Sequence, residues 1–395
     1  MEITRILNGI DQVQDYQEQL RYEKIALLTT GSALNRWMIP TLQYVNDRFD
    51  IQALFGAEYG IMGEKSVGER YESYTDIWTG LPAFSLFRFG SNNITREMLS
   101  KFDVLLVDLP LTGTRFNSYI PTMHSILRQL GETDKKVIIL DRPNPLGGML
   151  LDGPMLSLAM KQEEDDVSLP IRYGLSLGEL CRMMNEENKL ACNLDVIKVK
   201  PWYRDMSHPE FNRPWIVSQM HLPRFETCLL SVGLEVLRGT NLSVGLGTSL
   251  PFEVVGSPFL DAIQLSAALN KRNISGVIFS PIYFTPTSNI YQGIRCQGVQ
   301  IHVTDIRKIQ STRLMMEIIF EVLQLAGSDF VFTQDRQGKY IIDYLFGNNR
   351  LRRQPEDFEV ILDDAAKEVQ IFSEKCSPYL LYQTRAEAEA EMPNE

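Results

Sequence analysis

The chain has 395 residues, of which 44% are hydrophobic and 23% are charged. This composition is typical of a globular protein, and the length exceeds what one core usually holds, so two domains are expected. The formal net charge of −11 comes without a stripe of lysine or arginine, which excludes nucleic acid as an expected partner, and no segment is apolar for long enough to span a membrane.

The first third of the sequence alternates short apolar runs with amphipathic stretches. The runs predict strands at residues 24–30, 50–55, 82–86, 103–108 and 136–141. The stretches between them predict helices, including residues 34–48 and 117–130. This alternation indicates an α/β domain with a parallel sheet wound by helices, which we place at residues 1–160.

The pattern is mixed beyond residues 161–166, a polar segment that we expect to be an exposed connection near the domain boundary. Helices are expected at residues 177–188, 260–271, 309–324 and 355–375, and strands at 195–199, 277–283 and 298–304. Residues 161–384 are therefore assigned to a mixed α/β C-terminal domain. Residues 385–395 carry four glutamates and no apolar face, so a disordered acidic tail is expected.

The N-terminus and the cysteines bear on the compartment. The first eleven residues contain neither a basic region nor an apolar segment of secretory length, so a cytoplasmic location is expected, or a periplasmic one if a signal peptide was removed. Five cysteines, none spaced as C-x-x-C, favour free thiols in a reducing compartment. The four histidines lack the spacing of zinc ligands, so no metal and no cofactor is expected.

Glu58 stands where a strongly apolar run stops, between Gly56 and Gly60. Residues 50–55 predict a buried strand, and open α/β sheets bind ligands at the carboxyl ends of their strands. Glu58 is therefore a candidate acid. From spacing alone, an ordinary loop carboxylate or a helix cap is the alternative.

Residues 174–178 match the G-x-S-x-G pattern of a nucleophile elbow. Ser176 is followed three residues later by Glu179 and then by apolar residues at helical spacing, which is the pattern of a capping box that opens a helix. We therefore interpret Ser176 as a helix cap.

Two loops have polar groups suited to a ligand. Residues 239–248 are rich in glycine, and their hydroxyls and amide could bind a neutral sugar or simply form a tight turn. In residues 141–148, two prolines restrain Arg142 and Asn144 in preset directions, which suits either ligand positioning or a structural turn between domains.

Several distinctive motifs follow one another along the chain: residues 71–74 (YESY), 79–82 (TGLP), 140–148 (LDRPNPLGG), 239–241 (GTN), 251–253 (PFE), 283–287 (YFTPT) and 298–305 (GVQIHVTD). In these motifs, and over nearly its whole length, the chain resembles the exo-β-N-acetylmuramidases of the NamZ type, formerly a family of unknown function.

The resemblance implies a Rossmann-like domain without a nucleotide, a second α/β domain, and a site in the cleft between them. The implied reaction is release of terminal N-acetylmuramic acid from the non-reducing end of a peptidoglycan fragment, with Glu58 as general acid. The partner would be a small carbohydrate or muropeptide, and the oligomeric state is left open. Tyr59 is expected beside Glu58 in catalysis, and substrate contacts are expected from Glu72, Asp108, Arg115, Arg142, Asn144, Asn241, Thr248, Glu253 and Tyr283.

The chain departs from the family pattern at polar positions. Tyr59 replaces the histidine of Gly-Pro-Glu-His-Gly, and residues 108–116 lose an amide and a carboxylate of Asp-Ile-Gln-Asp-Val-Gly-x-Arg-Phe. Arg238, Val244 and Leu246 replace two acids and a base of Glu-Gly-Thr-Asn-x-Ser-Glu-Gly-Arg-Gly-Thr. The chain is thus a divergent member, and a catalytically silent paralogue that binds glycan or cell-wall fragments is the alternative function.

Overall fold

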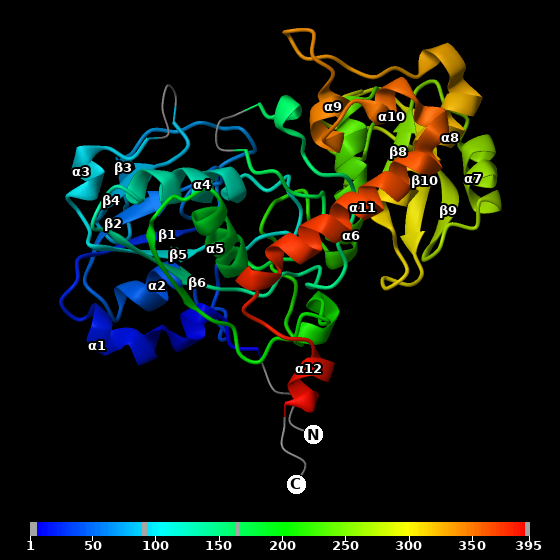
Figure 1. Cartoon of the computed structure of the whole chain (residues 1–395). Helices are drawn as coiled ribbons and strands as arrows, with labels where there is room; N and C mark the ends of the chain where they lie inside the picture. The colour runs from blue at the N-terminus through cyan, green and yellow to red at the C-terminus, as the bar shows by residue number, and fades with distance from the viewer. Residues whose placement is uncertain (1–5, 89–92, 163–165, 392–395) are drawn as a thin grey trace.

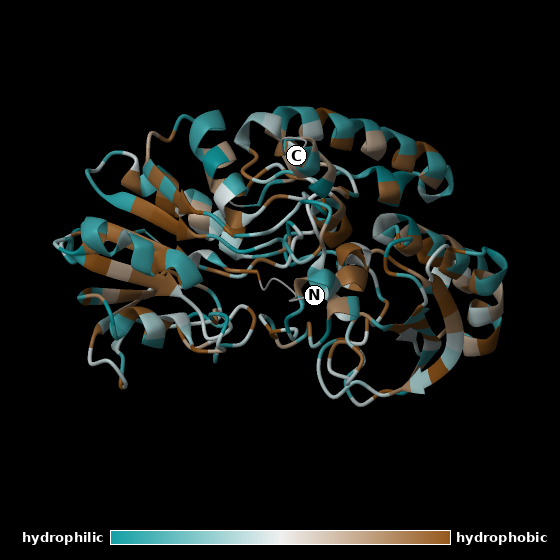
Figure 2. Ribbon diagram, turned by 90° about the horizontal axis from the view of Figure 1, so that it is seen from below, coloured by the Kyte–Doolittle hydropathy of each residue, from teal (hydrophilic) through white to brown (hydrophobic). Residues whose placement is uncertain are grey.

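The computed structural model describes residues 6–88, 93–162 and 166–391, and these residues form two α/β lobes (Figure 1). The first lobe contains a mainly parallel sheet, and the second contains a smaller antiparallel sheet. Figure 2 shows apolar residues, in brown, along the strands, while the helices outside them carry more hydrophilic residues, in teal. The predicted fold class, a Rossmann-like sheet domain followed by a second mixed α/β domain, is confirmed.

The sheet of the first lobe has seven strands within the described residues, in the order β3-β4-β2-β1-β5-β6-β7. Only β3 is antiparallel to its neighbour. When the parallel strands are counted along the chain, their order is that of the doubly wound Rossmann fold. The strands are β1 (Ile25–Thr29), β2 (Ile51–Gly56), β3 (Tyr74–Thr75), β4 (Pro82–Ser85), β5 (Val104–Asp108), β6 (Lys136–Leu140) and β7 (Asn193–Ile197).

Helices cover both faces of this sheet. In chain order, the helical elements of the first lobe are η1 (Gly9–Tyr16), α1 (Gln17–Leu20), α2 (Thr41–Asn46), α3 (Arg96–Leu99), α4 (Tyr119–Leu130), η2 (Leu158–Met160), α5 (Leu177–Glu187) and η3 (His208–Phe211). Side chains alternate between the faces of a strand. In β1, Ala26 and Leu28 therefore join the core beneath α4 and α5, whereas Ile25 and Leu27 join the core beneath η1 and α2.

The second lobe packs a three-stranded sheet, in the order β8-β10-β9, against helices. Its core is one apolar cluster to which α6, α7 and α8 contribute buried leucines, isoleucines and methionines. The elements are α6 (Phe225–Leu234), η4 (Glu235–Gly239), β8 (Val254–Ser257), α7 (Ala262–Lys271), β9 (Val277–Phe284), β10 (Cys296–Val303), α8 (Ser311–Ala326), η5 (Gly327–Asp329), α9 (Ile341–Phe346), α10 (Arg350–Arg353) and η6 (Pro355–Asp357).

The long helix α11 (Phe358–Cys376) links the two lobes and is coloured orange to red in Figure 1. Its first half places Phe358 and Ile361 in the core of the second lobe, and its last turns place Phe372 and Cys376 in the core of the first. The chain then continues through η7 (Ser377–Tyr379) and α12 (Arg385–Ala390) along the first lobe. The sequence therefore crosses between the lobes twice.

The expected domain boundaries differ from this arrangement. The first lobe extends past residue 160, since α5 and β7 complete its sheet and its helical layer. The polar composition of residues 161–166 therefore does not coincide with the end of the first lobe, and residues 163–165 lie outside the described part. The expected disorder of residues 385–395 is wrong for α12, where Thr384 caps the helix and Arg385 pairs with Glu210. Residues 392–395 lie outside the described part.

One predicted helix is much shorter than expected. Residues 34–48 contain only α2, because the side chain of Asn35 accepts hydrogen bonds from the backbone N–H groups of Trp37 and Ile39, at 2.9 and 3.0 Å. These bonds close a turn, and Pro40 then precedes the helix. Local side-chain bonds of this kind compete with helix formation.

Candidate active site between the lobes

A cavity of about 320 Å³ lies between the two lobes, and we call it the Glu58 cavity. One wall comes from the loops that follow β2 and β5, and the other from residues 219–238 of the second lobe, with residues 156–169 closing one side. The paired ends of β1, β2 and β5 define this edge of the sheet. The cavity therefore occupies the crevice at the carboxyl ends of the strands, where doubly wound proteins bind their ligands.

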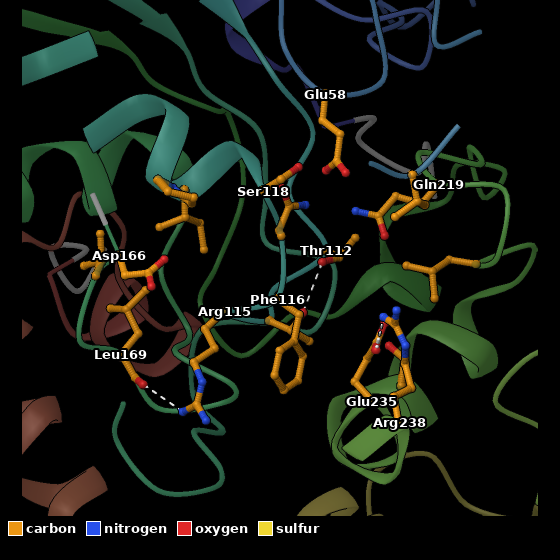
Figure 3. A pocket seen from close by; sticks show the side chains of 18 of the residues that line it. Glu58, Thr112, Arg115, Phe116, Ser118, Asp166, Leu169, Gln219, Glu235 and Arg238 are labelled. Atoms are coloured by element: carbon orange, nitrogen blue, oxygen red, sulfur yellow. Dashed lines mark hydrogen bonds and ion pairs between the residues drawn. The ribbon is translucent and has the colours of Figure 1, made fainter. Parts of the chain in front are cut away.

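Glu58 enters the cavity from the loop after β2 and is 8% exposed. Gly60 has φ +75°, a left-handed conformation that favours glycine, and it lets the chain turn directly after the acid. The N–H of Gly68 donates to Glu58 Oε1 at 2.8 Å, and among the described residues no other donor binds this carboxylate. Figure 3 shows the carboxylate pointing into the cavity toward Gln219. One oxygen is thus held by the backbone, while the other is available to a ligand.

Tyr59 lies beside Glu58 in the wall and is buried, with its ring 5.8 Å from the ring of Tyr119 in an edge-to-face contact. Burial, with a smaller contribution from the charge of Glu58, raises the pKa of the Tyr59 phenol far above its usual value of 10. The phenol therefore stays protonated at neutral pH. It can donate a hydrogen bond but cannot act as a base.

The wall of the second lobe presents Glu235 and Arg238 from η4 (Figure 3). His221 also lines the cavity. Arg238 Nη1 donates to Glu235 Oε2 at 2.8 Å, and His221 Nε2 lies 4.0 Å from Glu235 Oε1. Burial lowers the pKa of the His221 imidazole, although the charge of Glu235 opposes this. The carboxylate of Glu235 raises the pKa of Arg238. This wall therefore holds an ion pair beside a neutral imidazole.

Arg115 lines the cavity, but its guanidinium is bound to backbone carbonyls. Nη1 donates to the carbonyls of Pro154 and Leu169, at 2.5 and 3.0 Å, and Nη2 donates to the carbonyl of Leu345 at 2.6 Å. Leu345 belongs to α9 of the second lobe. Arg115 therefore fastens the loop after β5 to the second lobe.

Of the predicted substrate contacts, the structure brings only Arg115 to the Glu58 cavity, where it joins Glu58 and Tyr59. Asp108 and Arg142 form a bidentate ion pair with distances of 2.5 and 2.8 Å, and Thr41 also donates to Asp108. Asn144 donates to the carbonyl of Leu175 at 3.0 Å. These polar groups stabilise the loops that carry the cavity.

The remaining predicted contacts also lie outside the cavity lining. Asn241 bonds to the backbone of residues 329 and 331, and Thr248 donates to the carbonyl of Gly245. Glu253 accepts from Thr227 and Arg224. Glu72 and Tyr283 are exposed elsewhere on the surface.

Ser176 is the cap predicted from its sequence context. Its hydroxyl accepts from the N–H of Glu179 at 3.2 Å and donates to Asp141 Oδ2 at 2.6 Å, and the Glu179 side chain accepts from the N–H of Ser176. Ser176 is 1% exposed and does not line the Glu58 cavity. No group of three or more histidine, cysteine, aspartate or glutamate residues suited to a metal was found in the described ranges, and no described helix is long and apolar enough to cross a bilayer.

Sequence reasoning missed Gln219 and Glu235 as site residues. Glu235 interrupts the strongly apolar run of residues 228–237, and Arg238 directly follows this run. The two residues have the i, i+3 spacing of an ion pair. A charged pair within such a run signals a buried polar function. Gln219 has no comparable signal, because it lies in an irregular loop.

Comparison with known proteins agrees with this architecture. Two family models match in succession: Exo-β-N-acetylmuramidase NamZ, N-terminal, over residues 25–226, and its C-terminal counterpart over residues 229–382. The peptidoglycan β-N-acetylmuramidase NamZ of Bacillus subtilis (strain 168) is 33% identical over 384 residues, which are 96% of this chain and 92% of that protein. Crystal structures of two DUF1343 family proteins from Bacteroides fragilis NCTC 9343 have TM-scores of 0.86 and 0.74, at 29% and 25% identity, and each comparison covers 97% of this chain and 100% of the other. The chain therefore belongs to the exo-β-N-acetylmuramidase NamZ family.

Proposed function

We propose that this protein hydrolyses the glycosidic bond of a terminal N-acetylmuramic acid at the non-reducing end of peptidoglycan fragments. The observation that carries the proposal is the position of Glu58 at the carboxyl edge of a Rossmann-like sheet, facing a cavity between the lobes. The relative from Bacillus subtilis, a peptidoglycan β-N-acetylmuramidase by name, supports the substrate class.

Glu58 is proposed as the general acid. In its protonated form the carboxyl group would donate to the glycosidic oxygen as the bond to the anomeric carbon breaks. The bond from Gly68 orients one oxygen and leaves the other open to the substrate. The cavity volume of about 320 Å³ is at the small end of ligand pockets, which suits a single terminal sugar better than a continuous polymer.

A chromogenic β-N-acetylmuramide tests the proposal. The pure protein should release the aglycone, and Glu58→Gln should lower kcat by at least about 10²-fold, because it removes the proton donor while keeping the shape of the side chain. Glu97→Gln, which removes the same charge from an exposed position of α3, serves as the matched control and should retain full activity. A Glu58→Gln protein as active as the wild type would exclude Glu58 as the acid.

No observation favours the silent paralogue. For binding without catalysis, Val244 and Leu246 would have to offer a sugar an apolar surface in place of charged groups, but Val244 is 3% exposed in the core of the second lobe and Leu246 packs against the same core. Neither residue lines the Glu58 cavity. Calorimetric binding of muropeptides without turnover would restore the alternative.

A further inference from the structure

The acid in the Glu58 cavity needs a second chemical group. Glycosidases pair their acid with a second carboxylate or rely on the acetamido group of the substrate. Two further carboxylates line the cavity among the described residues, those of Asp166 and Glu235. Asp166 accepts from the N–H of Gln162 at 2.8 Å and lies in the segment that closes one side of the cavity. Glu235 comes from the opposite lobe and faces the cavity from the wall across from Glu58 (Figure 3).

Glu235 is bonded through one carboxylate oxygen, and its other oxygen is open. Its side chain is 9% exposed, and Arg238 donates to Oε2 at 2.8 Å. Oε1 receives no protein hydrogen bond from the described residues, and His221 Nε2 lies 4.0 Å from it. A water molecule could therefore donate to Oε1 without displacing a protein group.

The charges of Glu235 and Glu58 affect the same three side chains. Tyr59, His221 and Arg238 each experience the charge of both carboxylates. Electrostatic interactions of this kind fall off with distance, so both acids lie within range of the same three groups. The two carboxylates therefore belong to one site that is assembled from both lobes.

We propose that Glu235 is the second carboxylate of the reaction and activates the attacking water, while Arg238 acts as a positioning residue that orients it. This inference rests on the proposed hydrolysis.

The proposed step balances in atoms and charge. Glu58 gives its proton to the glycosidic oxygen, and the bond between that oxygen and the anomeric carbon breaks. Glu235 takes a proton from water, whose oxygen forms the new bond to the same carbon from the opposite face. Glu58 is left ionised and Glu235 protonated, and exchange of one proton through solvent restores both. The first sugar released would be the α-anomer, since a direct attack by water inverts the configuration.

Glu235→Gln tests the role while keeping the volume of the side chain and an acceptor for Arg238. We expect kcat to fall by about 10²–10⁴-fold, the range of general base catalysis, with KM changed only a few-fold. The acidic limb of the kcat/KM profile should disappear. The ionisable groups around Glu235 are Arg238, His221, Tyr59 and Glu58. His221→Asn is therefore measured as well, to test whether the imidazole causes the acidic limb, and this variant should keep that limb. A structural role for Glu235 would leave the pH profile unchanged.

Glu321→Gln provides the matched control, because Glu321 is a half-buried glutamate of the same lobe that pairs with Arg272 at 2.6 Å outside the cavity. It should keep wild-type kinetics. Glu235→Ala in sodium azide gives a second test, in which turnover should recover with formation of the α-glycosyl azide. NMR of the wild-type reaction should show the α-anomer first.

The outcomes separate the two proposals. An active wild type that is abolished by Glu58→Gln but unaffected by Glu235→Gln would overturn this inference and leave the proposed function standing. A β-anomer as the first product would also overturn it. A wild type that never releases the aglycone would overturn the proposed function and this inference together.

Discussion

Glu58 and Tyr59 are adjacent in the sequence yet offer different chemistry to the same cavity. Glu58 keeps one carboxylate oxygen open, whereas the Tyr59 ring packs on Tyr119 within the core of the first lobe. Because burial raises the pKa of the phenol, Tyr59 remains neutral at every pH below its ordinary value of 10. A protonated phenol can contribute one hydrogen bond to a substrate and no ionisation.

Tyr59→Phe should therefore have a small effect. Loss of a neutral hydrogen bond costs about 0.5–1.5 kcal/mol, which corresponds to at most a roughly tenfold drop in kcat/KM. The shape of the pH profile between pH 5 and about 9 should not change, since the native phenol carries no charge in this range. Steady-state kinetics across that range provide the measurement. Loss of a basic limb in Tyr59→Phe would show that the phenol ionises during the reaction.

Individual site residues could be predicted from sequence only where their chain environment was distinctive. The end of an apolar strand between two glycines singled out Glu58, and the structure places it in the cavity. Asp108 and Arg142 also follow strands, but a sequence cannot show that two such groups will bind each other. Glu235 stands out as a charge in an apolar run, but a local pattern does not show that it faces Glu58 from the other lobe. Contacts between lobes depend on tertiary packing that local patterns do not contain.

At the scale of single elements, helix α5 shows how a motif that suggests catalysis serves structure. Its first turn holds the reciprocal bonds of a capping box between Ser176 and Glu179, and the Ser176 hydroxyl also reaches the buried carboxylate of Asp141. Burial raises the pKa of Asp141 to about 6, while the bond from Ser176 lowers it. The serine hydroxyl thus gives its proton to Asp141 and accepts the N–H of Glu179.

Ser176→Ala should lower the free energy of unfolding by about 0.5–2 kcal/mol, because a helix cap is lost. Hydrolysis should continue at the wild-type rate, since Ser176 lies outside the Glu58 cavity. Urea denaturation followed by circular dichroism measures the first effect, and the muramide assay measures the second. An intact fold with no activity would instead favour the nucleophile elbow.

The elements themselves were largely predictable, because apolar periodicity reports burial directly. The five strands expected in the first third correspond to β1, β2, β4, β5 and β6, and the helix predicted at 309–324 corresponds to α8. The short α2 was not predictable, since the Asn35 turn that delays it depends on two side-chain hydrogen bonds. The assignment of β7 to the first sheet required the order of strands in space.

At the scale of the whole molecule, the proposed acid and base reside on different lobes, so their separation depends on how the lobes are joined. Two connections stand out. Helix α11 contributes side chains to both cores, and Glu368 in this helix accepts from the N–H of Met155 at 2.8 Å. Arg115 binds carbonyls on both sides of the cavity. These contacts set the geometry in which Glu58 and Glu235 face each other.

Arg115→Lys should disturb both stability and catalysis. An ammonium group cannot reach three carbonyls that a planar guanidinium fork satisfies together, and each buried carbonyl left without a donor costs about 1–3 kcal/mol. We expect a loss of about 2–4 kcal/mol in the free energy of unfolding. A misplacement of about 1 Å between the lobes can cost roughly 10²-fold in rate, so kcat should fall more than KM rises. Scanning calorimetry and steady-state kinetics on the same preparation measure the two effects.

Arg313→Lys, which alters a more exposed arginine paired with Glu359 on the outside of the second lobe, is the control. An Arg115→Lys protein with unchanged Tm and kcat would show that α11 alone fixes the relative position of the lobes.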